Sequence, residues 1–113
     1  MYWNERFSFA GTPRPKADGI PNSTAMFESW EDLKRERAAF DAVIIGWAEK
    51  VDPTWLAGDL TWYSGGAKRD MTKPAGLLVA HMFNHQTHHR GQAHALLTAA
   101  GVDPGDTDLF LLE

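Results

Sequence analysis

The chain is 113 residues long, carries a formal net charge of −4 and contains no cysteine. Its length allows one small domain, and 43% hydrophobic with 23% charged residues is an ordinary composition for a globular protein. The lack of cysteine excludes disulfides, thiolate metal sites and cysteine nucleophiles. The acidic balance argues against nucleic acid as a partner, and no apolar run approaches the roughly 18 residues that span a membrane. We therefore expect a single domain over residues 1–113, located in the cytoplasm, that binds neither nucleic acid nor membrane.

Residues 1–9 open the chain with four aromatic side chains and without a helix-capping residue. We expect a short helical segment there, similar to the last turns of a longer helix. Residues 11–21 contain three prolines and two glycines, which exclude a regular helix and indicate a connector.

A long amphipathic helix is predicted over residues 30–50. Ser29 is suited to cap its start because Asp32 follows three residues later, and Asp52-Pro53 is expected to end it. Arg37 interrupts the apolar face, and we interpret it either as a side chain at the edge of the core or as the partner of a carboxylate at an interface. The apolar residues recur in steps typical of a core helix: Trp30, Leu33, Phe40, Ile44, Trp47 and Val51.

A small β-hairpin is predicted next. Two short β-like runs, Leu60–Tyr63 and Arg69–Thr72, flank the turn-forming residues 64–67. Pro74 suits the first turn of a following helix, and Gly101 supplies a stop at its C-terminal end. We expect this second long helix over residues 75–100.

All five histidines of the chain lie between positions 81 and 94, within this last predicted helix. At about 100° per residue, with His85 taken as zero, His81 falls at about −40°, His88 at about −60° and His89 at about +40°. His94 falls at about 180°, on the opposite side. Four imidazoles therefore share an arc of roughly 100°, and we expect this arc to face the core.

A metal site is one interpretation of these four rings. Neutral imidazole binds zinc, nickel, copper or iron, and residues at i and i+4 stack on one helix face, where two rings can chelate one ion. His85 with His89 fits this spacing best, which makes His81 and His88 additional ligands or neighbours. The other interpretation is a set of core histidines bonded to backbone or water. Buried polar rings without partners would each cost about 1 to 3 kcal/mol, which favours the metal site.

Residues 81–92 read HMFNHQTHHRGQ and are followed by Leu96-Leu97 and Gly101-Val102-Asp103-Pro104. This succession resembles the last helix of the DinB family, and the hairpin that ends at Pro74 is similar to that family as well. The resemblance extends over nearly the whole chain. It implies an all-α, DinB-like helical bundle that holds a divalent metal, zinc or nickel, on three histidines. Two of the three ligands correspond to His85 and His89.

The resemblance places the third ligand on a second helix, upstream of a segment similar to residues 2–7. We expect the chain to lack the family's first helix and most of its second, and therefore this ligand. Two long amphipathic helices cannot bury their apolar faces as a lone hairpin. We therefore expect a homodimer in which two helical hairpins complete a four-helix bundle. The third ligand is then His81, His88 or a residue of the partner chain, or the site is empty.

Two functions are compatible with these features. The first is a metal-dependent hydrolase or a thiol-dependent transferase, in which the metal lowers the pKa of bound water towards about 7 or activates a thiol. Asn84, Gln92 and Tyr63 are candidate supporting residues, and the catalytic residues stay open. The second is a non-catalytic, stress-associated dimeric module with a vestigial or structural metal site, since loss of one ligand weakens a metal site greatly.

Overall fold

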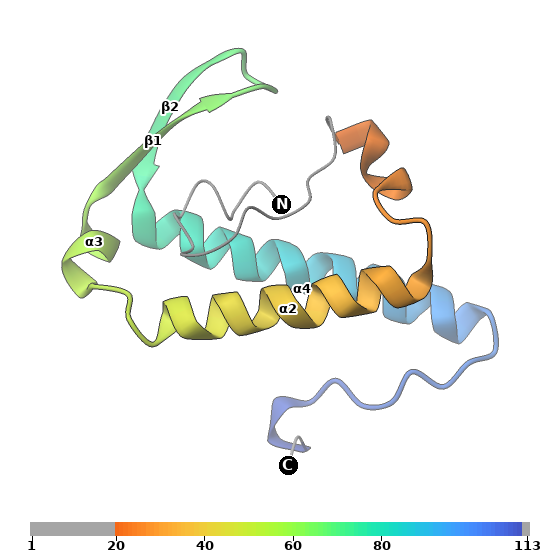
Figure 1. The fold of residues 1–113 in the computed structure, drawn as a ribbon. Coiled ribbons are helices and arrows are strands. Elements are labelled where there is room, and N and C mark those ends of the chain that lie inside the picture. The colour runs from red at the N-terminus through yellow and green to blue at the C-terminus, as the bar shows by residue number, and fades with distance from the viewer. Residues whose placement is uncertain (1–19, 112–113) are drawn as a thin grey trace. The chain divides into compact units, whose positions relative to one another are not determined.

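The structure is a computed structural model that describes residues 20–111 (Figure 1). The helical segment expected within residues 1–9 lies outside the described residues. The described part is mostly helical, as predicted, with one antiparallel sheet of two strands. In chain order the elements are η1 (Ile20–Ala25), α2 (Trp30–Ala48), α3 (Pro53–Ala57), β1 (Asp59–Ser64), β2 (Arg69–Pro74), α4 (Ala75–Ala99) and η2 (Leu109–Leu111).

The chain separates into two compact units, Met1–Gly76 and Leu77–Glu113, with the boundary inside α4. The first unit contains η1, α2, α3 and the hairpin, and the second contains most of α4 with the segment that follows it. The single domain expected from the sequence therefore stays a prediction, as does the four-helix bundle. Within residues 20–111, no helix is both long and apolar enough to cross a membrane.

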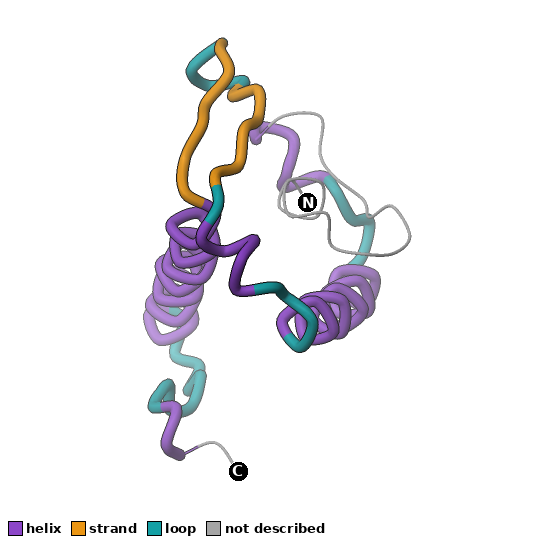
Figure 2. Tube along the Cα trace, turned by 90° about the vertical axis from the view of Figure 1, so that its left-hand side faces the viewer, coloured by secondary structure: helices purple, strands orange, loops and turns teal. Residues whose placement is uncertain are grey.

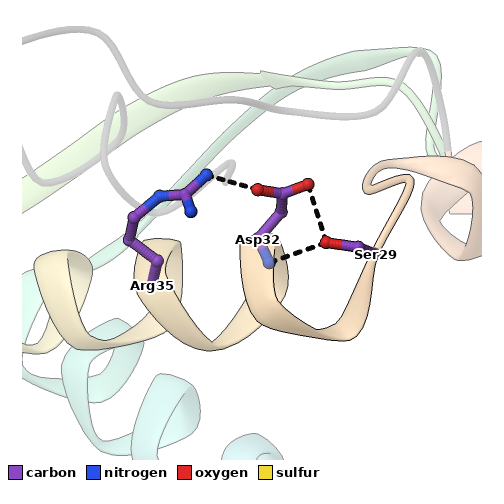
Figure 3. Close-up of polar contacts among 3 residues, drawn as sticks. All are labelled: Ser29, Asp32 and Arg35. Carbon is purple, nitrogen blue, oxygen red and sulfur yellow. Dashed lines mark hydrogen bonds and ion pairs between the residues drawn. The ribbon is translucent and has the colours of Figure 1, made fainter.

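Helix α2 begins where the sequence predicts, at a cap formed by Ser29 (Figure 3). The Ser29 hydroxyl accepts a hydrogen bond from the backbone N–H of Asp32 at 3.1 Å and donates one to the Asp32 carboxylate at 2.8 Å. Arg35 pairs with the other carboxylate oxygen. The Ser29 hydrogen bond first, and that of Arg35 second, hold the pKa of Asp32 below its ordinary value. The first turn of α2 is thus fixed by local contacts.

The apolar face of α2 is buried only in part. Phe40 and Ile44 are buried, whereas 65% of the Trp30 surface is exposed. Arg37 donates from Nε to Asp41 Oδ2 at 3.0 Å, and its second nitrogen lies 2.6 Å from Oδ1. Arg37 therefore pairs with a carboxylate of its own helix, one turn further on.

A short helix that the sequence did not predict, α3, follows α2. The helix α2 ends at Ala48, and Asp52 then caps α3 by accepting a hydrogen bond from the Thr54 N–H at 2.8 Å. Pro53 occupies the first position of α3, where its missing N–H costs nothing. Asp52-Pro53 was expected only to end a helix, but it also starts one. The rings of Trp47 and Trp55 meet edge to face at 5.9 Å and connect α2 to α3.

The predicted hairpin is confirmed, and its two strands run antiparallel, as Figure 2 shows. Thr61 pairs with Thr72, and their hydroxyl oxygens lie 2.8 Å apart. Pro74 was expected in the first turn of the next helix, but it is the last residue of β2. The N–H of Ala75 instead donates to the Gly58 carbonyl at 2.8 Å, which fixes the start of α4 against the end of α3. This proximity leaves little room at Gly76, where a Cβ atom would lie 3.1 Å from the Leu56 carbonyl.

Helix α4 ends at the glycine that the sequence predicts. Gly101 has a φ of +78°, a conformation that suits glycine, and its N–H donates to the Thr98 carbonyl. The N–H of Val102 donates to the Leu97 carbonyl, which completes a Schellman motif.

The four clustered histidines of α4 are exposed, so the expectation that they face the core is wrong. The buried residues of this helix are Ala75, Leu78 and Met82, which fall at roughly +20° to +80° on the same angular scale. This strip lies beside the histidine arc and overlaps only its edge. The arc therefore adjoins the buried strip and leaves the imidazoles accessible.

Candidate metal centre

The closest contact among the histidines joins His85 and His89, one turn apart on α4. Their Nε2 atoms are 3.0 Å apart, and the two rings are nearly perpendicular at 87° with centroids separated by 4.5 Å. The lone pair of an imidazole nitrogen lies in the plane of its ring. Two perpendicular rings with adjacent Nε2 atoms can therefore direct their lone pairs to one point beside the helix.

The spacing of these two nitrogens matches that of two ligands on one metal ion. With zinc–nitrogen bonds of about 2.0 to 2.1 Å, two ligands are separated by about 2.9 Å at a right angle and by about 3.3 Å at the tetrahedral angle. The observed 3.0 Å falls within this interval. Imidazole nitrogen is also a ligand type preferred by zinc and nickel. The two residues therefore fit a divalent ion in both chemistry and separation.

Gln92 determines which nitrogen of His89 carries the proton. The side-chain oxygen of Gln92 lies 2.8 Å from His89 Nδ1, and an amide oxygen can only accept. Nδ1 of His89 is therefore the donor, and Nε2 of the neutral ring keeps its lone pair. In the metal-free chain, Nε2–H of His85 donates to that lone pair. Such a hydrogen bond from the far side of the ring is the usual way in which proteins orient a metal-binding histidine.

His81 and His88 lie next to the pair, but in a different geometry. The ring of His85 stacks on that of His81 at 5.4 Å with an interplanar angle of 28°, and on that of His88 at 6.2 Å with 27°. His88 also meets the ring of His89 at 62°, with centroids 5.2 Å apart, farther than the 4.5 Å between His85 and His89. Loss of water around the ring, and then repulsion from the neighbouring imidazoles, place the pKa of His85 below its ordinary value of 6.5. This shift favours the neutral ring, which is the form that binds a metal.

The other candidate residues lie away from this pair. Nε2 of His94 lies 3.3 Å from the Gly105 carbonyl and connects α4 to the segment after it, a contact that the sequence did not predict. Arg90 donates to the Thr87 hydroxyl on the flank away from the pair. Asn84 is exposed on α4, and Tyr63 is exposed on β1 in the other compact unit. Of the proposed supporting residues on α4, Gln92 therefore has a defined contact with the pair.

Within residues 20–111, no group of three or more histidine, cysteine, aspartate or glutamate side chains is arranged to hold a metal ion. The described part of the chain therefore brings two convergent nitrogens together, not three.

The sequence model of the DinB family matches residues 3–113, which is nearly the full length. The chain belongs to the DinB family. This confirms the assignment that the histidine succession and the hairpin suggested. No curated protein and no solved structure matches the chain. The comparisons therefore establish membership in the DinB family. The function has to be argued from the geometry of the histidine pair.

Proposed function

We propose that this DinB-family chain binds a divalent metal ion, zinc or nickel, through Nε2 of His85 and Nε2 of His89. The observation that carries the proposal is the 3.0 Å separation of these two atoms in perpendicular rings. Folding alone does not account for the arrangement, because both side chains are exposed and neither contributes to the buried strip of α4. Gln92 keeps the His89 lone pair available at Nε2.

A metal-dependent hydrolase or thiol-dependent transferase is the first use of such a site. A bound ion supplies a Lewis acid that lowers the pKa of coordinated water or thiol. The role of the chain in this chemistry is to hold and orient: His85 and His89 provide nitrogen ligands, and Gln92 fixes the ring of His89. His81 and His88 are the additional ligands or neighbours closest to the pair. The accessibility of this helix face leaves a small substrate free to approach.

A non-catalytic, stress-associated module with an incomplete or structural metal site is the second candidate. A specific observation favours it: among the described residues, two nitrogens converge, whereas catalytic zinc sites generally use three protein ligands. A two-ligand site binds metal weakly unless another group completes it.

Dimerisation belongs to the same proposal. The buried apolar side chains among the described residues are few, and large apolar side chains remain exposed on both long helices. We infer a homodimer in which two copies bury these faces and complete a four-helix bundle. Light scattering at low micromolar concentration tests this, and a well-folded monomer would contradict it. The exposed residues are Trp30, Leu33 and Ile45 on α2, and Leu77, Phe83, Leu96 and Leu97 on α4.

Calorimetric titration with zinc and nickel tests metal binding directly. We expect saturable binding by the unaltered chain and its loss in the His85→Ala, His89→Ala double variant. His94→Gln is the matched control, since His94 lies on the same helix but bonds to the Gly105 carbonyl. The control should bind metal as the unaltered chain does. Absence of binding at tens of micromolar metal, or equal loss in the control, would refute the proposal.

A further inference from the structure

Among residues 20–111, the metal site proposed above has two convergent donors, and the following inference rests on that proposed site. Zinc in proteins is almost always surrounded by four ligands in a tetrahedron. The His85–His89 pair can supply two of these corners, because its nitrogens, 3.0 Å apart, need to separate by only about 0.3 Å to reach the tetrahedral spacing. Two further corners require donors from elsewhere in the chain, from solvent or from another molecule.

The remaining histidines of the same chain are poorly placed to fill these corners. All five histidines lie on α4, so His81, His88 and His94 are the other imidazoles that the chain contains. His81 and His88 each stack on His85 within 28° of parallel, and the ring of His88 is farther from that of His89 than the ring of His85 is, at 5.2 Å against 4.5 Å. Neither forms, with the pair, a group of three side chains arranged to hold a metal among the described residues. His94 lies on the opposite side of the helix and bonds to the Gly105 carbonyl.

A second copy of the chain has the donors that are missing, in the required arrangement. A tetrahedron has a two-fold axis through the midpoint of each edge. Each of these axes also passes through the midpoint of the opposite edge, so the axis through the His85–His89 edge only exchanges the two histidines. Rotation about either of the other two two-fold axes carries the His85–His89 pair onto the two empty corners. Two-fold symmetry is also the commonest symmetry of protein dimers, and it brings the same surface of both copies together. No residue other than the observed pair is needed.

The surface of α4 around the pair is suited to contact with its own copy. Within its 25 residues α4 carries one charged side chain, Arg90, which lies at about 140° from His85. In contrast, seven charged side chains occur in the 19 residues of α2. Leu96 falls at about +20°, in line with the pair, and 72% of its surface is exposed. Two α4 helices can therefore meet along the histidine arc without repulsion between charged side chains, and they bury Leu96 in doing so.

We propose that two copies of this chain share one zinc ion, held by Nε2 of His85 and His89 from each copy on the two-fold axis of the dimer. The four imidazoles leave no open coordination position, so the ion is structural and holds the two α4 helices together. This arrangement favours the non-catalytic dimeric module over the hydrolase or transferase.

The stoichiometry of zinc binding tests the shared site. The full chain, freed of metal with a chelator, is titrated with zinc by calorimetry, and its mass is followed by native mass spectrometry. We expect one zinc per two chains and a dimer that carries a single ion. Substitution with cobalt(II) should give the intense visible absorption of a four-coordinate site. One zinc per chain, or the weak absorption of a six-coordinate ion, would overturn the shared site while leaving metal binding intact. No zinc binding at all would instead refute the proposed function.

A charged substitution beside the His85–His89 pair distinguishes a zinc site shared by two chains from a site within one chain. Leu96→Glu places two carboxylates near the two-fold axis while both histidines remain. We expect it to weaken zinc binding by at least about a hundredfold, because a single chain offers two imidazoles instead of four. Thr98→Glu is the matched control, since Thr98 is also exposed on α4 and lies about 160° from Leu96 around the helix. It should bind zinc like the unaltered chain. Unchanged affinity in Leu96→Glu would overturn the proposal.

Discussion

The two long helices of this protein use their polar residues differently. In α2, charged side chains pair with one another within the helix, as Arg37 does with Asp41 and Arg35 with Asp32. In α4, the polar face consists of imidazoles that contact each other and one amide. Both helices also have a buried strip, which contains Phe40 and Ile44 in α2.

This difference indicates which residues serve the fold and which serve a ligand. The polar contacts of α2 cap its first turn and pair charged side chains along its surface. Local stabilisation of the helix is therefore enough to explain them. The four clustered imidazoles of α4 are exposed and fill no core, yet two of them converge at 3.0 Å. On α4 the fold depends on the strip that contains Met82, and ligand binding depends on the adjacent arc.

The largest effect on stability is expected at Met82, whose side chain is fully buried. Met82→Ala removes packed atoms and leaves a cavity, which should lower the free energy of unfolding by about 2 to 5 kcal/mol. Chemical denaturation in the presence of a chelator measures this change. Asn84→Ala, on the exposed side of the same helix, should lower stability by less than about 0.5 kcal/mol. Equal losses in the two variants would show that α4 is not divided into a buried and an exposed side.

Removing one ligand should lower metal affinity and leave stability nearly unchanged, which is the opposite of the effect expected at Met82. His89→Ala is expected to weaken zinc or nickel binding by about a hundredfold or more, because it deletes one of two convergent nitrogens. Its free energy of unfolding without metal should change by less than about 0.5 kcal/mol, since the ring is exposed. Metal titration and denaturation of the same preparation measure both quantities. A large loss of stability with unchanged metal affinity would assign His89 to the fold.

The Gln92 side chain should influence metal affinity through His89 alone. Gln92→Leu removes the acceptor at His89 Nδ1, so the ring is no longer fixed with its lone pair at Nε2. We expect metal binding about tenfold weaker, in the range found for residues that orient a ligand. Asn84→Leu is the control on the same helix and should leave the affinity unchanged. Equal metal affinities for the Gln92 variant and the unaltered chain would show that Gln92 does not contribute to the metal site.

The extent to which the sequence predicts this structure follows from how local each signal is. Ser29, the hairpin turn and Gly101 act within a few residues, and their elements appear where they were predicted. The i, i+4 spacing likewise places His85 beside His89. Asp52-Pro53 is ambiguous because the same pair of residues can end one helix and start another. The exposure of the histidine arc was not predictable, since helical periodicity does not determine which of two adjacent strips is buried.

A smaller effect is expected at the cap of α2. Ser29→Ala leaves the N–H of Asp32 without its acceptor and should lower the free energy of unfolding by about 1 kcal/mol. Metal affinity should not change, because the site lies on the other helix. Thermal or chemical denaturation, with metal titration as the second measurement, checks both parts. A change in metal affinity would contradict the division of roles between α2 and α4.

The pH dependence of this cap should give the smallest effect. The pKa of Asp32 is held below its ordinary value of 3.8, chiefly by the Ser29 hydrogen bond and then by Arg35. Asp32 therefore binds protons more weakly in the folded chain than in the unfolded chain. Its stabilising contribution is complete above pH 3.8 and is lost as the pH falls through the lower folded value. The stability difference between the unaltered chain and Asp32→Asn should accordingly be constant from pH 7 to about pH 5 and shrink in more acidic solution. Denaturation across this range measures the difference. Parallel profiles down to pH 3 would show that the carboxylate of Asp32 does not stabilise the first turn of α2.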